Sequence, residues 1–189
     1  MPELPEVETT RRGIEPHIEG KRITKMVVRE RRLRWPIPNA LEAQLAGQTV
    51  DSVGRRGKYL LLRINTGSLI VHLGMSGSLR VLEPGTQQPL KKHDHVELVF
   101  DDATVLRYHD PRRFGCILWQ EDPVSRHPLI ESLGPEPLSA DFNARVLFAR
   151  SRGRKAPIKT FIMDSKVVVG VGNIYANEAL FFAGINPQR

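Results

Sequence analysis

The feature that most constrains the fold is a change of pattern near residue 122. Before that point, short runs of β-branched and aliphatic residues follow one another, separated by turn-forming residues. We expect strands over residues 23–28, 58–64, 68–73, 95–100, 104–108 and 115–120. Asn65-Thr66-Gly67 and Asp101-Asp102-Ala103 lie where they would close two hairpins. Many short strands in succession predict an all-β sandwich or barrel for this part of the chain.

A helix is expected before the strands, because residues 5–18 place Val7, Ile14 and Ile18 at helical spacing. After residue 122 the pattern of alternating strand-forming residues ends. Prolines crowd the next stretch, at Pro123, Pro128, Pro135 and Pro137. Prolines at this density interrupt regular structure and mark a linker. We therefore predict one domain over residues 1–122 and a second over residues 123–189.

The second domain has a helical pattern. We expect three helices, which end near residues 148, 164 and 183. Ser139 and Asp141 are candidate N-caps for the first helix. Pro157 suits the first turn of the second helix, and Gly172-Asn173 opens the third.

Lysine and arginine number 28 against 21 aspartate and glutamate, which gives a formal charge of +7. This excess favours a polyanionic partner, most commonly nucleic acid, although a merely basic soluble protein would have the same composition. The cations cluster at Arg55, Arg56 and Lys58, and again between Arg145 and Lys166. Each cluster alone could be a solvated face, whereas two together predict a surface that follows a nucleic-acid backbone.

Several other classes of protein are disfavoured. Cys116 is the only cysteine, so an internal disulfide and a zinc site built from several cysteines are excluded. The acidic, proline-containing start is unlike a signal peptide, and no apolar run approaches the length of a membrane span. We therefore expect a cytoplasmic, reduced protein without a membrane partner.

Pro2 has the most distinctive chemistry. If Met1 is removed, the chain begins with a secondary amine, and an α-amino group titrates near about pH 8, so a fraction is nucleophilic at neutral pH. Attack on a sugar C1′ would give an iminium that eases elimination of phosphate, and Glu3 beside it could move protons. The alternative is an ordinary proline at the second position. If Met1 stays, the Pro2 nitrogen is an amide and cannot attack.

Seven segments form a further pattern along the whole chain. They are residues 2–9 (PELPEVET), 58–61 (KYLL), 72–80 (HLGMSGSLR), 93–96 (HDHV), 110–115 (DPRRFG), 133–138 (LGPEPL) and 168–176 (VVGVGNIYA). In this order they resemble the bacterial formamidopyrimidine-DNA glycosylases. Leu4 favours this oxidised-purine branch over the related endonuclease-VIII branch, which typically begins Pro-Glu-Gly-Pro-Glu.

The resemblance implies an α+β, multi-domain fold. It consists of an N-terminal β-sandwich with a flanking N-terminal helix, followed by part of a helix–two-turn–helix domain. The implied activity is base-excision repair: removal of 8-oxoguanine and formamidopyrimidines through a Schiff base on the N-terminal proline, then β,δ-elimination at the abasic site. The implied partner is duplex DNA with oxidised purines or abasic sites, bound by a monomer in the bacterial cytoplasm and nucleoid.

The resemblance also implies catalytic roles. Pro2 corresponds to the Schiff-base nucleophile, and Glu3 to the acid that protonates the sugar ring oxygen. Lys58 corresponds to a second general acid–base group near the lesion nucleotide and its phosphate, although by pattern alone it would be an ordinary strand-edge lysine. Glu6 corresponds to a residue that shapes the active site.

Met75, Arg112 and Phe114 correspond to the side chains that fill the gap left by a flipped nucleotide. Apolar wedges and a planar guanidinium suit such a gap, although Met75 and Phe114 would otherwise be assigned to the core. Further residues correspond to contacts with the DNA backbone, namely His72, His93, Arg154, Lys159 and Asn173. The histidines could instead be neutral core residues, and the register of the match is loosest around Arg154.

The family normally continues past the equivalent of Arg189 to a zinc ribbon with four cysteines. The resemblance therefore implies one structural zinc in full-length relatives, no cofactor in residues 1–189, a C-terminal zinc finger absent from this chain, and impaired excision. Two other functions stay open. One is a damaged-DNA-binding fragment without catalysis, and the other is an RNA-binding protein that shares only the glycine turn at residues 170–173.

Overall fold

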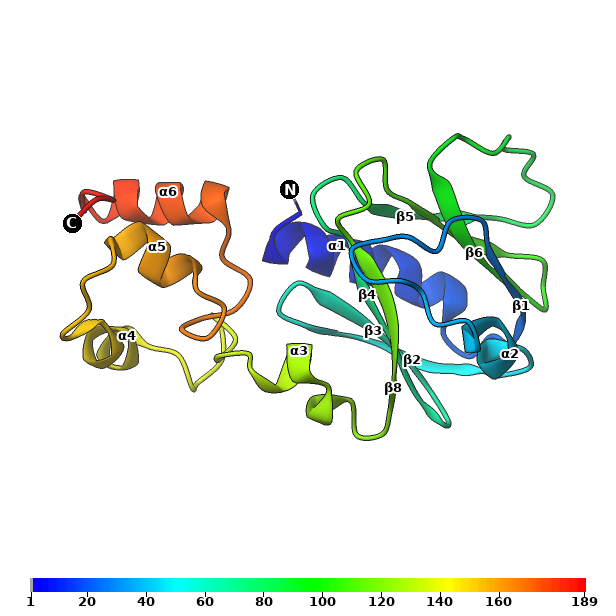
Figure 1. Ribbon diagram of the computed structural model, residues 1–189, viewed down its shortest axis with the longest axis horizontal. Coiled ribbons are helices and arrows are strands. Elements are labelled where there is room, and N and C mark those ends of the chain that lie inside the picture. The colour runs from blue at the N-terminus through cyan, green and yellow to red at the C-terminus, as the bar shows by residue number, and fades with distance from the viewer. Residues whose placement is uncertain (1) are drawn as a thin grey trace. The chain divides into compact units, whose positions relative to one another are not determined.

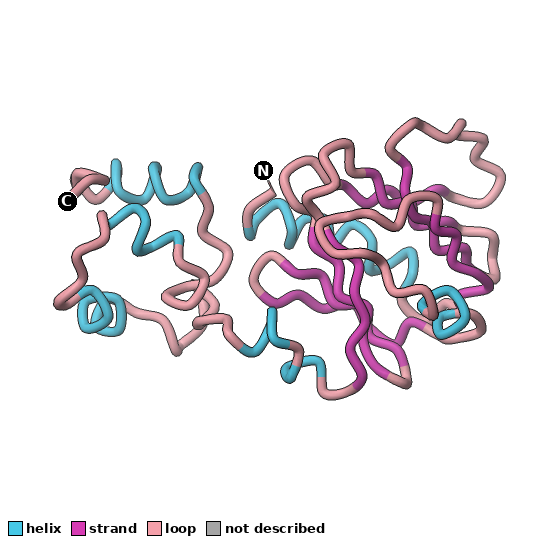
Figure 2. The backbone as a smooth tube through the Cα atoms, in the orientation of Figure 1, coloured by secondary structure: helices cyan, strands magenta, loops and turns pink. Residues whose placement is uncertain are grey.

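The structure, a computed structural model, describes residues 2–189, and Met1 lies outside the described residues. The chain forms two compact units that divide between Arg126 and His127, whereas the proline pattern predicts a division after Asp122. Among the described residues, the strands all belong to the first unit, and the second unit consists of helices and loops (Figure 2).

The first unit contains two four-stranded antiparallel sheets (Figure 1). In spatial order, one sheet is β1 (Ile23–Val28), β6 (Asp94–Phe100), β7 (Val105–His109) and β5 (Ser78–Leu82). The other is β2 (Val50–Arg56), β3 (Tyr59–Ile64), β4 (Gly67–His72) and β8 (Cys116–Glu121). Residues of both sheets form a single hydrophobic core. The predicted sandwich is therefore confirmed, and the alternative of a barrel is wrong.

Two helices complete this core. α1 (Leu4–Ile18) buries the predicted helical face and packs against β2, β3 and β5 (Figure 1). α2 (Leu41–Leu45) is a short helix that packs against β1. Alternate residues of β3, namely Leu60, Leu62 and Ile64, are at most 1% exposed. This alternation is expected for a strand with one face turned inward.

The sequence pattern misses β2, β5 and α2. In β2 the buried residues are Val50 and Val53, and in β5 the buried residue is Leu82. Neither strand therefore shows the regular alternation that marks a half-buried strand. Both predicted hairpins are confirmed: Ile64 pairs with Gly67 across the first, and the second turns through Ala103, which has a φ of 67°.

The second unit contains the helices α3 (Pro128–Glu131), α4 (Ala144–Ser151), α5 (Ile158–Met163) and α6 (Asn173–Phe182). A short 3-10 turn, Val124–Arg126, precedes it. The core of this unit is formed by Phe161, Ile162, Val167, Val168, Ala176 and Leu180. Pro157 is the N-cap of α5, one position before the predicted first turn, and Gly172 is the N-cap of α6. No helix within residues 2–189 is long and apolar enough to cross a membrane.

The predicted start of α4 is wrong. Its N-cap is Asn143 rather than Ser139 or Asp141, and the Asn143 side-chain oxygen accepts a hydrogen bond from the Val146 amide at 3.1 Å. The Ser139 hydroxyl instead donates to the Glu136 carbonyl at 2.9 Å. Serine, aspartate and asparagine all form such local bonds with the backbone, so the pattern alone does not select one cap among them.

Candidate active site

The predicted site residues of the first unit lie at one end of the sandwich. In one sheet this end is formed by the cross-strand neighbours Tyr59, His72 and Cys116. In the other sheet it is formed by Ser78, His109 and Asp94. Residues 73–77 join the two sheets from β4 to β5, and residues 110–115 join them from β7 to β8. Strand pairing therefore brings distant parts of the sequence to one end of the fold.

The start of α1 holds the predicted nucleophile and acid. Glu3 is the N-cap of α1 and is only 1% exposed, and Pro2, which precedes it, is half-buried. A Glu6 side-chain oxygen accepts a hydrogen bond from the Glu3 amide at 2.9 Å. This capping contact fixes the main chain at Glu3 and so fixes the position of Pro2 next to it.

Lys58 lies in the two-residue turn between β2 and β3, where Gly57 has a φ of 56°. The lysine is half-buried, and this burial lowers the pKa of its ammonium group, while the charges of Glu3 and Glu6 act to raise it. An electrostatic effect of this kind requires the three groups to be near one another. The structure thus brings together Glu3, Glu6 and Lys58, three of the four predicted catalytic residues, beside Pro2.

Arg55 supports the Lys58 turn, a role that sequence reasoning missed. Its Nε donates to Glu8 at 3.0 Å, and its Nη1 donates to the Gly57 carbonyl at 2.8 Å. Glu8 belongs to α1, so Arg55 connects the helix that carries the nucleophile to the turn that carries the lysine. The prediction that Arg55 follows a DNA backbone therefore needs correction, because its guanidinium is engaged within the protein.

Glu8 is held by three arginines. Hydrogen bonds from Arg11, then Arg12 and Arg55, lower the pKa of the Glu8 carboxyl to about 2, against an opposing effect of burial. The carboxylate therefore stays ionised well below neutral pH. Nothing in the local sequence signals the contact with Arg55, because the two residues are 47 positions apart.

His72 is a neutral hydrogen-bonding group. Burial, followed by the charges of Lys58 and Arg34, lowers the pKa of its imidazole to about 4. Its Nδ1 accepts a hydrogen bond from the Gly74 amide at 2.9 Å, which leaves the proton on Nε2. Its ring centroid lies 4.9 Å from that of Tyr59 on the neighbouring strand. His72 can therefore offer a neutral N–H donor at this end of the sandwich.

Met75, Arg112 and Phe114 lie on the two segments that join the sheets. Met75 is 41% exposed and Phe114 45% exposed, so neither belongs to the core. The Arg112 guanidinium carbon lies 4.7 Å from the centroid of the Phe114 ring, as in a cation–π contact. A pocket is lined by His72, Gly74, Met75, Phe114 and Arg34. Sequence reasoning did not single out Arg34.

His93 precedes β6 at the same end of the sandwich. Its ring meets those of His95 and His109 edge-on, at centroid distances of 6.0 Å. Burial, followed by nearby cations beginning with Lys92, lowers the pKa of the His93 imidazole. Like His72, it is therefore a neutral donor near physiological pH. It lines a pocket that includes the cations Lys92 and Arg113 and the carboxylates Glu30 and Asp94.

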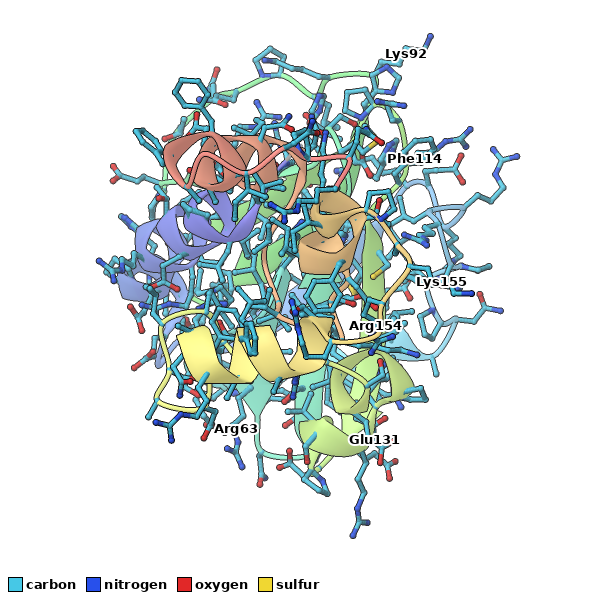
Figure 3. All side chains as sticks on the ribbon, turned by 90° about the vertical axis from the view of Figure 1, so that its left-hand side faces the viewer. Arg63, Lys92, Phe114, Glu131, Arg154 and Lys155 are labelled. Carbon is cyan, nitrogen blue, oxygen red and sulfur yellow. The ribbon has the colours of Figure 1, made fainter. Side chains whose placement is uncertain are left out.

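The second unit carries the other predicted DNA contacts. Asn173 is exposed in the first turn of α6, where backbone N–H groups can bind a phosphate. Lys159 is half-buried on α5. Arg154 and Lys155 follow the end of α4 (Figure 3), and the Arg154 Nε donates to the Arg150 carbonyl at 3.3 Å. Arg154, Lys155 and Lys159 add positive charge to this unit.

No cluster of three or more potential metal ligands is present among residues 2–189. Cys116 is buried at the start of β8, and this burial raises the pKa of its thiol to about 12. A thiol with such a pKa is protonated at neutral pH and is a poor nucleophile.

Comparisons with known proteins identify both units. The formamidopyrimidine-DNA glycosylase N-terminal domain matches residues 1–117, and the formamidopyrimidine-DNA glycosylase H2TH domain matches residues 133–189. A formamidopyrimidine-DNA glycosylase of Methylococcus capsulatus is 62% identical over 189 residues, which make up 100% of this chain and 69% of that protein. The enzyme of Thioalkalivibrio sulfidiphilus is 60% identical over the same shares of the two chains.

Solved structures agree. The Lactococcus lactis formamidopyrimidine-DNA glycosylase, bound non-covalently to DNA with an abasic site, superposes with a TM-score of 0.90 at 35% identity, over 99% of this chain and 72% of that one. A mutant of the same enzyme in complex with Fapy-dG-containing DNA gives a TM-score of 0.90 at 36% identity, over 100% and 69% of the chains. The protein therefore belongs to the formamidopyrimidine-DNA glycosylase family.

Proposed function

We propose that this protein removes oxidised purines from duplex DNA and then cleaves the resulting abasic site. The observation that carries the proposal is the cluster of Glu3, Glu6 and Lys58 beside the N-terminal Pro2. A glycosylase with lyase activity needs a nucleophile, an acid and a partly desolvated amine at one place. The family relationship and the complexes of the Lactococcus lactis enzyme with abasic-site and Fapy-dG DNA support the same substrate class.

Pro2 is the proposed nucleophile. Its nitrogen attacks C1′ of the damaged nucleotide, the bond between C1′ and the base breaks, and an iminium links the proline to the sugar. The iminium withdraws electrons, so the proton on C2′ becomes acidic and the 3′ phosphate leaves by β-elimination; the 5′ phosphate then leaves by δ-elimination. This role requires prior removal of Met1, because a peptide bond would make the Pro2 nitrogen an unreactive amide.

Glu3 is the proposed acid for base excision. Its carboxyl is buried immediately after Pro2, so a sugar bonded to Pro2 is within its reach. A proton given to the ring oxygen of that sugar opens the ring and lets the iminium form. Glu6 assists indirectly, because its hydrogen bond to the Glu3 amide holds the start of α1 in place.

Lys58 is the proposed partner in proton transfer. Burial lowers the pKa of Lys58, so its uncharged amine forms more readily than that of an exposed lysine. Such an amine can accept a proton from the Pro2 nitrogen before the attack or from C2′ during elimination. The ammonium form can then bind the phosphate of the lesion nucleotide.

Met75, Arg112 and Phe114 are the proposed gap-filling residues. Their exposure and the stacking of Arg112 on Phe114 support this role, because a flipped nucleotide leaves an unstacked gap in the duplex. We further propose that the DNA backbone is bound through His72, His93, Arg154, Lys159 and Asn173. The two histidines would act as neutral N–H donors, whereas Arg154 and Lys159 would contribute charge.

We propose a bacterial cytoplasmic protein that associates with the nucleoid through its DNA partner and acts as a monomer. Its proposed chemistry uses amino-acid side chains and the chain's own amine, with no cofactor bound by residues 1–189. The structural zinc expected in full-length relatives would belong to a segment beyond these residues.

Borohydride trapping tests the proposed nucleophile. The chain is incubated with an 8-oxoguanine duplex, and borohydride reduces the iminium to a stable amine, so that enzyme and DNA migrate as one covalent species. We expect the adduct from protein whose mass shows that Met1 is absent, and none from protein that retains Met1. Pro2→Gly should leave a primary amine that reacts more slowly. An adduct from protein that retains Met1 would refute the assignment of Pro2.

The exposed gap-filling residues also favour a second function, recognition of damaged DNA without catalysis. This function needs Met75, Arg112 and Phe114 but does not need the Pro2 amine. Protein that retains Met1 would then bind an 8-oxoguanine duplex as tightly as processed protein does. The same mass measurement, combined with a binding titration, separates the two functions.

A further inference from the structure

Asp110 is a fully buried carboxylate that none of the proposed chemical steps uses. Its side chain is 0% exposed, and both oxygens are hydrogen-bonded. Oδ1 accepts from the Ser76 hydroxyl at 2.7 Å. Oδ2 accepts from the Gly115 amide at 2.9 Å and lies 3.2 Å from the Tyr108 hydroxyl. Burial of a carboxylate is unfavourable unless its oxygens are satisfied, so the surroundings are specifically built to hold this group.

The partners of Asp110 lie on both segments that join the sheets. Ser76 belongs to residues 73–77, which carry Met75, and Gly115 ends residues 110–115, which carry Arg112 and Phe114. One segment joins β4 to β5, and the other joins β7 to β8. The two segments start and end on neighbouring strands, because β4 pairs with β8 and β5 pairs with β7. A single carboxylate therefore ties together two segments that are distant in sequence.

Ser76 extends this connection to Arg112. The Ser76 hydroxyl donates a hydrogen bond to Asp110, and the Ser76 oxygen accepts a hydrogen bond from the Arg112 amide at 3.1 Å. The Asp110 carbonyl accepts from the Arg113 amide at 3.2 Å and lies 2.8 Å from the Nε2 of His95. The backbone on which Arg112 is mounted is thus held on two sides.

Close backbone contact completes the link between the segments. Gly74 has a φ of 62°, and a Cβ atom at this position would lie 2.4 Å from the Gly115 nitrogen. A Cβ atom on Gly115 would lie 1.9 Å from the Tyr108 hydroxyl oxygen. Gly74 is therefore required for the two segments to touch, and Gly115 is required for its own segment to pack against Tyr108.

We propose that Asp110 and Ser76 are positioning residues that hold Met75, Arg112 and Phe114 as one preorganised wedge. The inference rests on the proposed gap-filling role of those three side chains. A wedge has to displace stacked bases as it enters the duplex, which costs a few kcal/mol. Ordering two separate loops at the same moment would add a further entropic cost, and a fixed connection between the loops avoids it.

Ser76→Ala tests the inference with the smallest change. It removes the hydroxyl that joins Asp110 to the Arg112 amide and leaves the bonds of Asp110 to Gly115 and Tyr108 in place. Ser52→Ala, on β2 away from both segments, is the matched control. Asp110→Asn is the conservative variant, because its amide group can donate to the Ser76 oxygen while its carbonyl oxygen accepts from Gly115.

The readout is the rate of local unstacking. A duplex carries 2-aminopurine beside 8-oxoguanine, and the 2-aminopurine fluorescence rises when the neighbouring bases unstack. We expect Ser76→Ala to slow this rise about tenfold, as loss of one hydrogen bond worth about 1.4 kcal/mol in the inserted state would do. Cleavage of a preformed abasic site should change less than about twofold. The unfolding temperature should fall by a few degrees relative to that of Ser52→Ala, because a buried oxygen of Asp110 loses its hydrogen bond. Unstacking by Asp110→Asn should stay within about threefold of the wild-type rate.

A double-mutant cycle shows whether Ser76 acts through the wedge. In an Arg112→Ala background, Ser76→Ala should have no further effect on unstacking, because the arginine that it positions is gone. Equal slowing in both backgrounds, or a wild-type rate for the single variant, would overturn the inference. Equal loss of unstacking and abasic-site cleavage would also overturn it, as a purely structural effect. If the wild type neither unstacks the duplex nor forms the borohydride adduct, the proposed function itself is wrong.

Discussion

Replacement of Arg55 tests whether the turn that carries Lys58 depends on support from α1. Arg55→Met removes the guanidinium while keeping an apolar side chain of similar length. Two interactions disappear, the 3.0 Å bond to Glu8 and the 2.8 Å bond to the Gly57 carbonyl. Hydrogen bonds to charged groups contribute about 1.5–3 kcal/mol each. Both side chains of the ion pair are largely buried, at 16% and 24% exposed, so solvent weakens the pair only partly.

The expected loss is smaller than the sum of the two bonds, because Glu8 keeps its bonds to Arg11 and Arg12. We expect the free energy of unfolding of the first unit to fall by about 2–3 kcal/mol. For a unit of this size, that corresponds to a fall in unfolding temperature of about 5–10 °C. Arg63→Met, on the exposed side of β3 with a side chain that is 62% exposed, is the control and should change little.

Activity should report on the turn itself. A loosened turn exposes Lys58 to water, and because burial is what lowers the pKa of this lysine, the pKa should rise. The uncharged amine then forms only at higher pH. In a plot of rate against pH, the part of the curve that depends on Lys58 should therefore move to higher pH by about half a unit or more. The assay is single-turnover cleavage of an abasic-site duplex across pH. An unchanged profile together with an unchanged unfolding temperature would refute the supporting role of Arg55.

Four further outcomes are expected. Glu3→Gln should lower excision of 8-oxoguanine about 10²–10⁴-fold while leaving DNA affinity nearly unchanged, and it should spare cleavage of a preformed abasic site more than excision; an equal loss of binding and chemistry would count against this role. Glu8→Gln should be less stable than the wild type at neutral pH. The difference in unfolding temperature should vanish as pH falls from about 4.5 to about 2, because Glu8 stabilises the fold only while its carboxyl is ionised. Lys159→Gln should flatten the plot of log K against log salt by about one unit if the lysine binds a phosphate, and an unchanged slope would identify a merely solvated side chain. A preparation of residues 1–189 should carry no stoichiometric zinc by atomic absorption, and it should excise 8-oxoguanine more slowly than a full-length family member while cleavage of abasic sites persists better; comparable excision rates would contradict this expectation.

Local patterns were sufficient to predict the elements that bury one regular face. Val7, Ile14 and Ile18 mark the inward face of α1, and the alternating residues of β3 mark its inner side. The β3–β4 hairpin follows from its turn residues. Strand β5 could not be predicted in this way, because only Leu82 of its five residues is buried. Pairing with β7 sets the position of this strand.

The candidate site was predictable from the family's motifs rather than from residue types. By type, Met75 and Phe114 are core residues, yet both are more than 40% exposed. Their exposure follows from their places on the segments that cross between the sheets. The supporting contacts were not predictable at all. Glu8 and Arg55 are 47 positions apart and Ser76 and Asp110 are 34 apart, so only the folded chain brings each pair together.

The electrostatics of the sandwich end act on Lys58 in opposite directions. Burial lowers the pKa of Lys58, whereas Glu3 and Glu6 raise it, so two opposing effects set its charge. His72, with a pKa of about 4, can donate to DNA without adding a cation beside the lysine. A phosphate that arrives next to Lys58 adds negative charge and raises the lysine pKa. Binding of DNA therefore favours the ammonium form of Lys58, which can pair with that phosphate.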